Sequence, residues 1–185
     1  MDFSNLVHIA DGKAGRAIFV DDDVFQREMD QIFARAWLFV GHESQVPKPN
    51  DFYVSRMGQD SVILTRDAQG QVHVLLNSCR HRGMRLCRHG EGNSRLFTCP
   101  YHGWSYSTDG NLVSTPGELV GVPGYEKYYH SELDKKAWGL VPVAQMVNHR
   151  GTIWATWDPD APSFADYMGG MLQWLDSALD HRDGS

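Results

Sequence analysis

Two mixed cysteine–histidine motifs near the middle of this 185-residue chain constrain its fold more than any other feature. Cys79-x-His81 is followed, after seventeen residues, by Cys99-x-x-His102, and the chain has only three cysteines in total. Each motif offers one thiolate and one imidazole. Thiolates suit zinc or iron–sulfur clusters, whereas imidazoles suit zinc, copper or iron. The fold is therefore expected to bring two loops together around one metal site.

Two kinds of site fit this set of side chains. One is a tetrahedral zinc bound by two cysteines and two histidines, and the other is a [2Fe–2S] cluster with cysteine on one iron and histidine on the other. Zinc fingers usually pair like with like, two cysteines on one knuckle and two histidines on the other. Here each motif mixes both residue types and lies among β-rich segments. This mixture favours the two-iron cluster, whose ligand set is that of a Rieske centre.

The sequence around the motifs predicts many short strands. They are expected over 37–41, 52–56, 61–65, 72–77, 96–98, 105–106, 112–114, 140–147 and 152–157. Turn-forming stretches separate them, notably Pro47-Lys48-Pro49-Asn50, Asp67-Ala68-Gln69-Gly70 and Asp109-Gly110-Asn111. Short strands with glycine and proline between them indicate a mainly β fold, either an antiparallel β-sandwich or a small barrel.

A helix is expected towards each end of the chain. Asp21-Asp22-Asp23 supplies an N-cap and places acidic groups at the positive end of the first helix. Apolar residues then recur at spacings of three and four, at Val24, Phe25, Met29, Ile32, Phe33 and Trp37. A second helix is expected over 164–179, with one side formed by Met168, Met171, Leu172, Leu175 and Leu179.

The composition argues against several classes of protein. A formal net charge of −6 disfavours binding to nucleic acid or to anionic membrane surfaces. Apolar runs are only a few residues long, so no membrane-spanning segment is expected, and residues 1–7 lack the features of a secretory signal. Three cysteines do not make a disulfide scaffold. They favour a metal or redox role in a cytoplasmic protein.

The two motifs and their neighbours resemble a known family. Cys79-Arg80-His81-Arg82-Gly83-Met84, together with Cys99-Pro100-Tyr101-His102-Gly103-Trp104, is similar to the Rieske motif in the large (α) subunit of aromatic-ring-hydroxylating dioxygenases. The similarity extends through Ile32-Phe33-Ala34-Arg35-Ala36-Trp37, Gly41-His42-Glu43-Ser44 and Tyr106-x-x-Asp109-Gly110. The resemblance implies a Rieske-type antiparallel β-sandwich with two cluster-binding loops, flanked by an N-terminal and a C-terminal helix.

The resemblance also implies a site and a role. A [2Fe–2S] cluster is expected on Cys79, His81, Cys99 and His102, receiving electrons from a ferredoxin or reductase. In the family these electrons reach a mononuclear Fe(II) in a second, catalytic domain, whose ligands include an Asp-x-x-His-x-x-x-x-His run. This sequence has no such run. We therefore expect the Rieske part of an oxygenase, which does not hydroxylate substrates by itself.

The expected organisation has three parts: an N-terminal helical arm (1–36), a Rieske [2Fe–2S] domain (37–158) and a C-terminal helix (159–185). That helix should lead to a catalytic domain outside this sequence, and neighbouring oxygenase subunits are expected partners. The apolar side of the first helix is expected to pack, with the catalytic domain as one candidate partner. The alternative is a free-standing ferredoxin-type Rieske carrier. The sequence leaves the aromatic substrate undetermined.

Residues around the motifs are expected to tune the site. Gly83 and Gly103, like Gly90 and Gly92, suit tight loops whose backbone N–H groups reach the sulfurs. Trp104 and Tyr101 should shield the cluster or fill the core beneath it. A cationic rim is expected from Arg80, Arg82, Arg85, Arg88 and Arg95, unless these residues pair with local carboxylates. Such a rim would stabilise a reduced cluster and attract an acidic electron donor.

The remaining cysteine and several histidines are expected to stay outside the metal site. Cys87 fits no ligand spacing and is predicted to be a buried, inert thiol. His89 is predicted to be a loop residue, and His42 and His73 to be hydrogen-bonded strand residues. The rings of the two candidate histidine ligands are expected to be exposed at the tip of the domain, or to be covered there by a contact with another molecule.

Overall fold

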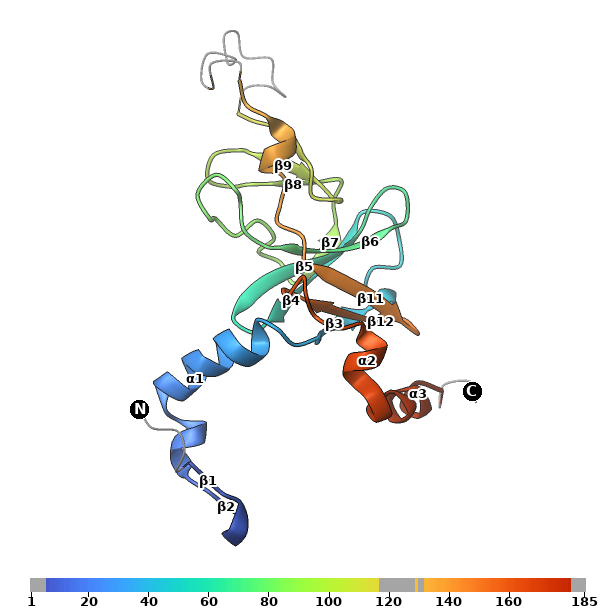
Figure 1. Cartoon of the computed structure of the whole chain (residues 1–185). Coiled ribbons are helices and arrows are strands. Elements are labelled where there is room, and N and C mark those ends of the chain that lie inside the picture. The colour runs from blue at the N-terminus through green and yellow to red at the C-terminus, as the bar shows by residue number, and fades with distance from the viewer. Residues whose placement is uncertain (1–5, 117–128, 130–131, 181–185) are drawn as a thin grey trace.

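The computed structural model describes residues 6–116, 129 and 132–180, in which antiparallel strands dominate (Figure 1). The strands of the main body are β3 (Leu38–His42), β4 (Asp51–Met57), β5 (Asp60–Arg66), β6 (Val72–Leu76), β7 (Glu91–Asn93), β8 (Leu96–Thr98), β9 (Ser105–Ser107), β10 (Leu112–Ser114), β11 (Gln145–His149) and β12 (Thr152–Thr156). They form three sheets, with strand orders β6-β5-β4-β7, β11-β12-β3 and β10-β9-β8. The predicted mainly β, antiparallel sandwich is confirmed.

The four-stranded sheet is the middle layer, because both of its faces are covered. Alternate residues of its strands point to opposite faces and pack into different clusters. Val62 and Leu64 of β5 pack with Val40 of β3 and Ile153 of β12 in one buried cluster. Ile63, between them, packs on the other face with residues of β8, β9 and β10 and of the motif loops. Figure 1 shows this arrangement, with β8 and β9 on one side of β5 and with β3, β11 and β12 on the other. The metal motifs belong to the first of these two sides.

The N-terminal arm is less helical than predicted. It begins with a two-stranded ribbon, β1 (Val7–His8) and β2 (Lys13–Ala14), and two short 3₁₀ turns, η1 (Ile9–Asp11) and η2 (Arg16–Phe19). The predicted helix follows as α1 (Asp22–Glu28), which continues into a π-helical turn, η3 (Met29–Phe33). Asp21 caps α1 as expected, since its Oδ1 accepts hydrogen bonds from the backbone N–H groups of Asp23 and Val24.

The C-terminal helix is broken where a single helix was predicted. It consists of α2 (Phe164–Met168), a 3₁₀ turn η7 (Gly169–Met171) and α3 (Leu172–Asp180). Gly169 has a φ of 48°, which a helix cannot accommodate and which glycine adopts without a steric penalty. Figure 1 shows α1 and α2 leaving the body on the side of β3 and β12. The first and last residues of the predicted terminal segments, 1–5 and 181–185, lie outside the described residues.

Three further differences from the sequence-based prediction have physical causes. The strand expected over 140–147 begins only at Gln145, because Pro142 has no N–H for a sheet ladder and instead forms an isolated bridge with Leu75. β7 was not predicted, since Glu-Gly-Asn has no apolar alternation. Short 3₁₀ turns also appear at η4 (Glu43–Gln45) and η6 (Lys135–Trp138). Within the part of the chain that the structure describes, no helix is long and apolar enough to cross a bilayer.

Candidate metal centre

The two motifs occupy loops that share one backbone frame. The first loop follows β6, and the second joins β8 to β9. In the first, the N–H of Cys79 donates to the carbonyl of Met84 (2.8 Å), and the N–H of Gly83 donates back to the carbonyl of Cys79 (2.8 Å). In the second, Cys99 donates to Trp104 (2.7 Å) and Gly103 to Cys99 (2.9 Å). Each cysteine therefore opens a turn that closes five residues later.

Glycine is required in each turn by the backbone and not by lack of space. Gly83 has a φ of 70° and Gly103 a φ of 74°, a region that L-residues with a side chain rarely adopt. A Cβ at either position would meet no atom closer than 3.9 Å. These two glycines allow the tight turns that were expected, and their own N–H groups donate to the cysteine carbonyls. The backbone of His81 makes the hydrogen bond to the Cys79 thiol.

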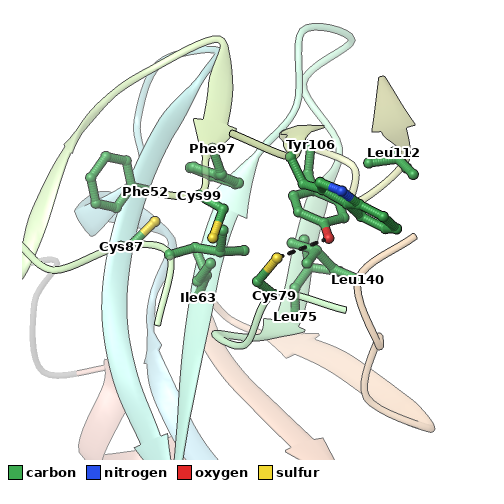
Figure 2. Packing of buried hydrophobic residues seen from close by; sticks show 12 residues of the cluster. Phe52, Ile63, Leu75, Cys79, Cys87, Phe97, Cys99, Tyr106, Leu112 and Leu140 are labelled. Carbon is green, nitrogen blue, oxygen red and sulfur yellow. Dashed lines mark hydrogen bonds between the residues drawn. The ribbon is translucent and has the colours of Figure 1, made fainter. Parts of the chain in front are cut away.

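Both motif cysteines are buried in the core beneath the loops, at 2% and 3% exposure. The phenol of Tyr106 lies 3.4 Å from Cys79 Sγ and accepts the N–H of Arg80 (3.1 Å), so its own proton is available to the sulfur (Figure 2). Burial raises the pKa of the Cys79 thiol, and the nearby Cys99 raises it further, whereas the hydrogen bonds from Tyr106 and His81 lower it. Two buried thiolates this close require a cation to be stable.

The two motif histidines lie next to each other with their rings edge to face. The rings of His81 and His102 have centroids 4.7 Å apart, and the Nδ1 atom of each is buried without a hydrogen-bond partner among the described residues. Trp104 stacks on His81 (5.1 Å, 8° between planes), and Tyr101 lies over His102 (3.8 Å, 32°). Both histidine residues are partly exposed. Aromatic neighbours cover part of each ring.

These donor atoms fit a two-iron cluster. A buried polar atom without a partner costs about 1–3 kcal/mol, so two such nitrogens on neighbouring rings favour a partner for each beyond the described residues. Burial lowers the pKa of His81, with further contributions from His102 and Arg82, which favours the neutral imidazole that a metal needs. Among the described residues, no three His, Cys, Asp or Glu side chains are placed to hold one metal ion. A two-iron cluster needs only two protein ligands on each iron.

Cys87 and the other histidines are placed as predicted. Cys87 is buried, and burial raises the pKa of its thiol to about 12, which keeps it protonated and unreactive. His73 contacts Asp67 (2.7 Å between Nε2 and Oδ2), and His42 Nδ1 contacts Ser44 Oγ (2.8 Å). His89 is an exposed loop residue.

A buried asparagine fixes the far end of the first loop. Asn77 Oδ1 accepts the N–H groups of Leu86 (3.1 Å) and Cys87 (2.9 Å), while its Nδ2 donates to the carbonyl of Cys87 (2.9 Å). Nδ2 also donates to Ser61 Oγ on β5 (3.2 Å). The amide side chain therefore acts as a short strand partner for the returning loop. The sequence-based prediction did not find this role, although an asparagine at the end of an apolar strand next to a cysteine motif is a signal that could have indicated it.

The arginines near the motifs form a cationic rim. Arg80, Arg82, Arg85, Arg88 and Arg95 are all exposed. None of them forms an ion pair with a carboxylate of the described residues, which favours a cationic rim over the alternative that they only neutralise local acids. The guanidinium of Arg80 lies over the ring of Trp138 at 5.8 Å. This positive segment stands out in a chain whose formal net charge is −6.

An antiparallel sandwich that carries two loops with the ligand set Cys/His and Cys/His defines a Rieske-type domain. Comparison with protein families agrees, since the family model of the Rieske [2Fe-2S] domain matches residues 36–126. Residues 36–126 are therefore a member of this family.

Relatives identify the branch of the family. The chain is 42% identical over 182 residues to the biphenyl 2,3-dioxygenase subunit alpha of Rhodococcus jostii (strain RHA1), and 43% identical over 176 residues to the chlorobenzene dioxygenase subunit alpha of Cupriavidus sp. (strain PS12). These alignments cover 98% and 94% of this chain but only 38% and 37% of the relatives.

The solved structures give the same assignment. A naphthalene 1,2-dioxygenase from Rhodococcus sp. superimposes with a TM-score of 0.82 at 38% identity, covering 92% of this chain and 37% of that one. The chain thus matches the Rieske portion of aromatic-ring dioxygenase α subunits, as the motifs predicted, and the Rieske domain implies a [2Fe–2S] cluster. It spans less than two fifths of the length of the curated relatives it matches.

Proposed function

We propose that Cys79 and Cys99 bind one iron of a [2Fe–2S] cluster, and that His81 and His102 bind the other iron through Nδ1. The observation that carries this proposal is the pair of buried Nδ1 atoms, without a hydrogen-bond partner among the described residues, on neighbouring rings of the same two loops that hold two buried thiols. The second loop repeats the backbone frame of the first, so each loop presents one sulfur and one ring nitrogen.

The surrounding residues set the properties of this site. When bound, the cluster supplies a one-electron couple, which in the wider protein carries electrons from a ferredoxin or reductase to a mononuclear Fe(II) of a catalytic domain outside this sequence. The Tyr106 phenol donates to Cys79 Sγ and stabilises negative charge on that sulfur. Burial, together with Cys79, raises the pKa of Tyr106, so the donor keeps its proton. Arg82 holds positive charge next to His81.

The attachment to a catalytic domain is supported by the two ends of the chain. Large apolar side chains are exposed on the arm and on the C-terminal helix, with Ile9 at 90%, Phe19 at 77%, Trp174 at 65% and Met171 at 61%. A free-standing carrier has no use for such surfaces, whereas a domain of a larger enzyme buries them. We accordingly propose the division into an arm (1–36), a Rieske domain (37–158) and a connecting helix (159–185), with oxygenase subunits as neighbours.

Chemical analysis tests the cluster directly. The purified protein should contain about two irons and two acid-labile sulfides per chain. One zinc per chain without sulfide would contradict the proposal, and so would a protein without metal. The same preparation, mixed with an arene, reductant and added Fe²⁺, should form no cis-dihydrodiol. Product above background would show that the chain contains a catalytic iron site of its own.

Reduction by a protein donor tests the electron-transfer role. A reduced plant-type ferredoxin is a suitable probe, because its potential of about −400 mV lies below the range of Rieske centres, roughly −150 to +300 mV. Stopped-flow reduction should slow as ionic strength rises, since screening weakens steering by the arginine rim. Arg82→Gln should slow reduction at low salt, whereas Arg16→Gln, the same charge change on the arm, should not. Equal effects of both variants would reject a steering role for the rim.

A further inference from the structure

Trp104 joins the two motif loops. Its backbone carbonyl accepts the N–H of Cys99 and closes the second loop, while its indole stacks on His81 of the first loop with only 8° between the planes. The indole is almost fully buried, at 2% exposure. His102, by contrast, is covered by Tyr101, which is 56% exposed. The orientation of His81 is therefore tied to that of a buried ring.

Two residues beyond the motifs fix the indole in turn. The Nε1–H of Trp104 donates to the Tyr129 hydroxyl at 3.0 Å, and the two rings meet edge to face at 6.0 Å. Trp138 approaches the indole from another direction, edge to face at 5.8 Å. Tyr129 itself is half-buried and packs against the core cluster that contains both motif cysteines. The indole is thus held by one hydrogen bond and two ring contacts.

We propose that Tyr129 is a positioning residue for His81. Its hydroxyl fixes the plane of the Trp104 indole, and the indole fixes the ring of His81, whose unpartnered Nδ1 is the proposed iron ligand. The proposal rests on the proposed cluster for its functional meaning. The clamp itself is made only of residues of this chain. A buried N–H without its acceptor is unfavourable, so loss of the hydroxyl leaves the indole free to tilt.

The decisive variant is Tyr129→Phe, which removes the hydroxyl and keeps the ring. Pulsed EPR of the reduced cluster measures the nitrogen couplings of its two histidine ligands. In Tyr129→Phe one coupling should change and broaden while the other stays as in the wild type, with iron content unchanged. Tyr101→Phe is the matched control, because it removes a hydroxyl next to His102. It should leave the nitrogen coupling of His102 unaltered. No change in Tyr129→Phe, or an equal change in both couplings, overturns the proposal.

Two further measurements guard against a merely structural effect. In a Trp104→Phe background, which has no indole N–H, adding Tyr129→Phe should change the couplings no further. Any additional change contradicts action through Trp104.

NMR of the ¹⁵N-labelled, metal-free full chain tests the clamp without a cluster. The Trp104 indole signal is assigned by its absence in Trp104→Phe. Its hydrogen exchange should become roughly two- to tenfold faster in Tyr129→Phe, as expected for one lost hydrogen bond. Unchanged exchange refutes the clamp even where the EPR variant loses iron. A wild-type protein without iron and sulfide refutes the proposed function instead, and the exchange measurement still decides on the clamp.

Discussion

The two motif loops have the same backbone but unlike surroundings. Each is closed by a cysteine N–H and by a glycine with positive φ, and each delivers one thiol and one imidazole. The first loop has a phenol next to its sulfur and a buried indole on its ring. The second loop has an exposed tyrosine over its ring. The backbone places the donor atoms, whereas the side chains around it decide how each donor behaves.

The largest effect should come from removing a proposed ligand. Cys79→Ser and Cys99→Ser should each abolish cluster assembly, because both loops contribute a sulfur to the same iron. Iron and sulfide per chain are the measurement. Cys87→Ser is the matched control, a buried cysteine of the same stretch that should keep its full iron content. Loss of iron from the control, or its retention in either ligand variant, would show that the ligand set is wrong.

The shared backbone frame predicts equal sensitivity at the two glycines. Gly83→Ala and Gly103→Ala should each destabilise the protein by roughly 1–2 kcal/mol, because a residue with a Cβ is strained at positive φ. Urea unfolding measures the free energies. Gly90→Ala, in the same stretch but without a positive φ and with no atom within 4 Å of its Cβ, should have little effect. Clearly unequal losses of unfolding free energy at the two glycines would contradict the equivalence of the two loops.

The Tyr106 phenol distinguishes the two sulfurs, because it contacts Cys79 Sγ. Tyr106→Phe removes the hydrogen bond to Cys79 Sγ, which stabilises the more negative, reduced cluster. The midpoint potential should fall by about 40 mV, if the bond favours the reduced form by about 1 kcal/mol. Redox titration measures the shift, with Tyr101→Phe as a control that stays near the wild-type value. A rise in potential would mean that the phenol does not donate to sulfur.

The smallest effect concerns the hairpin turns next to the two loops. Asp67 lies before the first loop and Asp109 after the second. Burial raises the pKa of Asp67, but hydrogen bonds from His73, Gln71 and Gln69 outweigh this and hold it below the ordinary value. For Asp109, burial is outweighed by hydrogen bonds from Ser107 and Asn111.

A lowered carboxyl pKa in the folded state stabilises the protein fully above the unfolded pKa, near 3.9, and this contribution disappears as the pH falls through the folded pKa. Asp67→Asn should therefore cost about 1 kcal/mol at pH 6 and much less at pH 2.5. Asp109→Asn should cost less, because its carboxylate is more exposed than that of the buried Asp67. Unfolding free energies across this pH range measure both, and a cost for Asp67→Asn that grows towards low pH would contradict the assignment.

Much of the fold could be predicted because it is encoded locally. β4, β5 and β6 are apolar runs bounded by turn residues, and Asp21 marks the start of α1 as its N-cap. β7 could not be predicted in this way. It forms because Gly92 lets the Phe52 ring of the neighbouring strand lie against the backbone, where a Cβ would come within 2.9 Å of the ring. That contact depends on a pairing between segments forty residues apart in sequence.

The candidate site also has parts that local sequence predicts and parts that depend on tertiary contacts. The spacing of the cysteines and histidines indicated the loops, and the structure brings the two histidine rings next to each other and the two thiols next to each other. The role of Tyr106 was missed although it stands two residues after Trp104, because a strand position alone does not say which sulfur a phenol will meet. Tyr129 was missed since nothing in its local sequence links it to an indole 25 residues earlier.

The buried amide of Asn77 has a consequence for how the cofactor enters the protein. Its hydrogen bonds to Leu86, Cys87 and Ser61 involve protein atoms only, so they hold the first loop in shape before any iron or sulfide arrives. The first loop therefore becomes ordered when the protein folds and not when the cluster is inserted. A preorganised site binds its ligand more tightly than a flexible one, because less ordering is needed on binding. The metal-free protein therefore already has the first of its two cluster-binding loops in the bound shape.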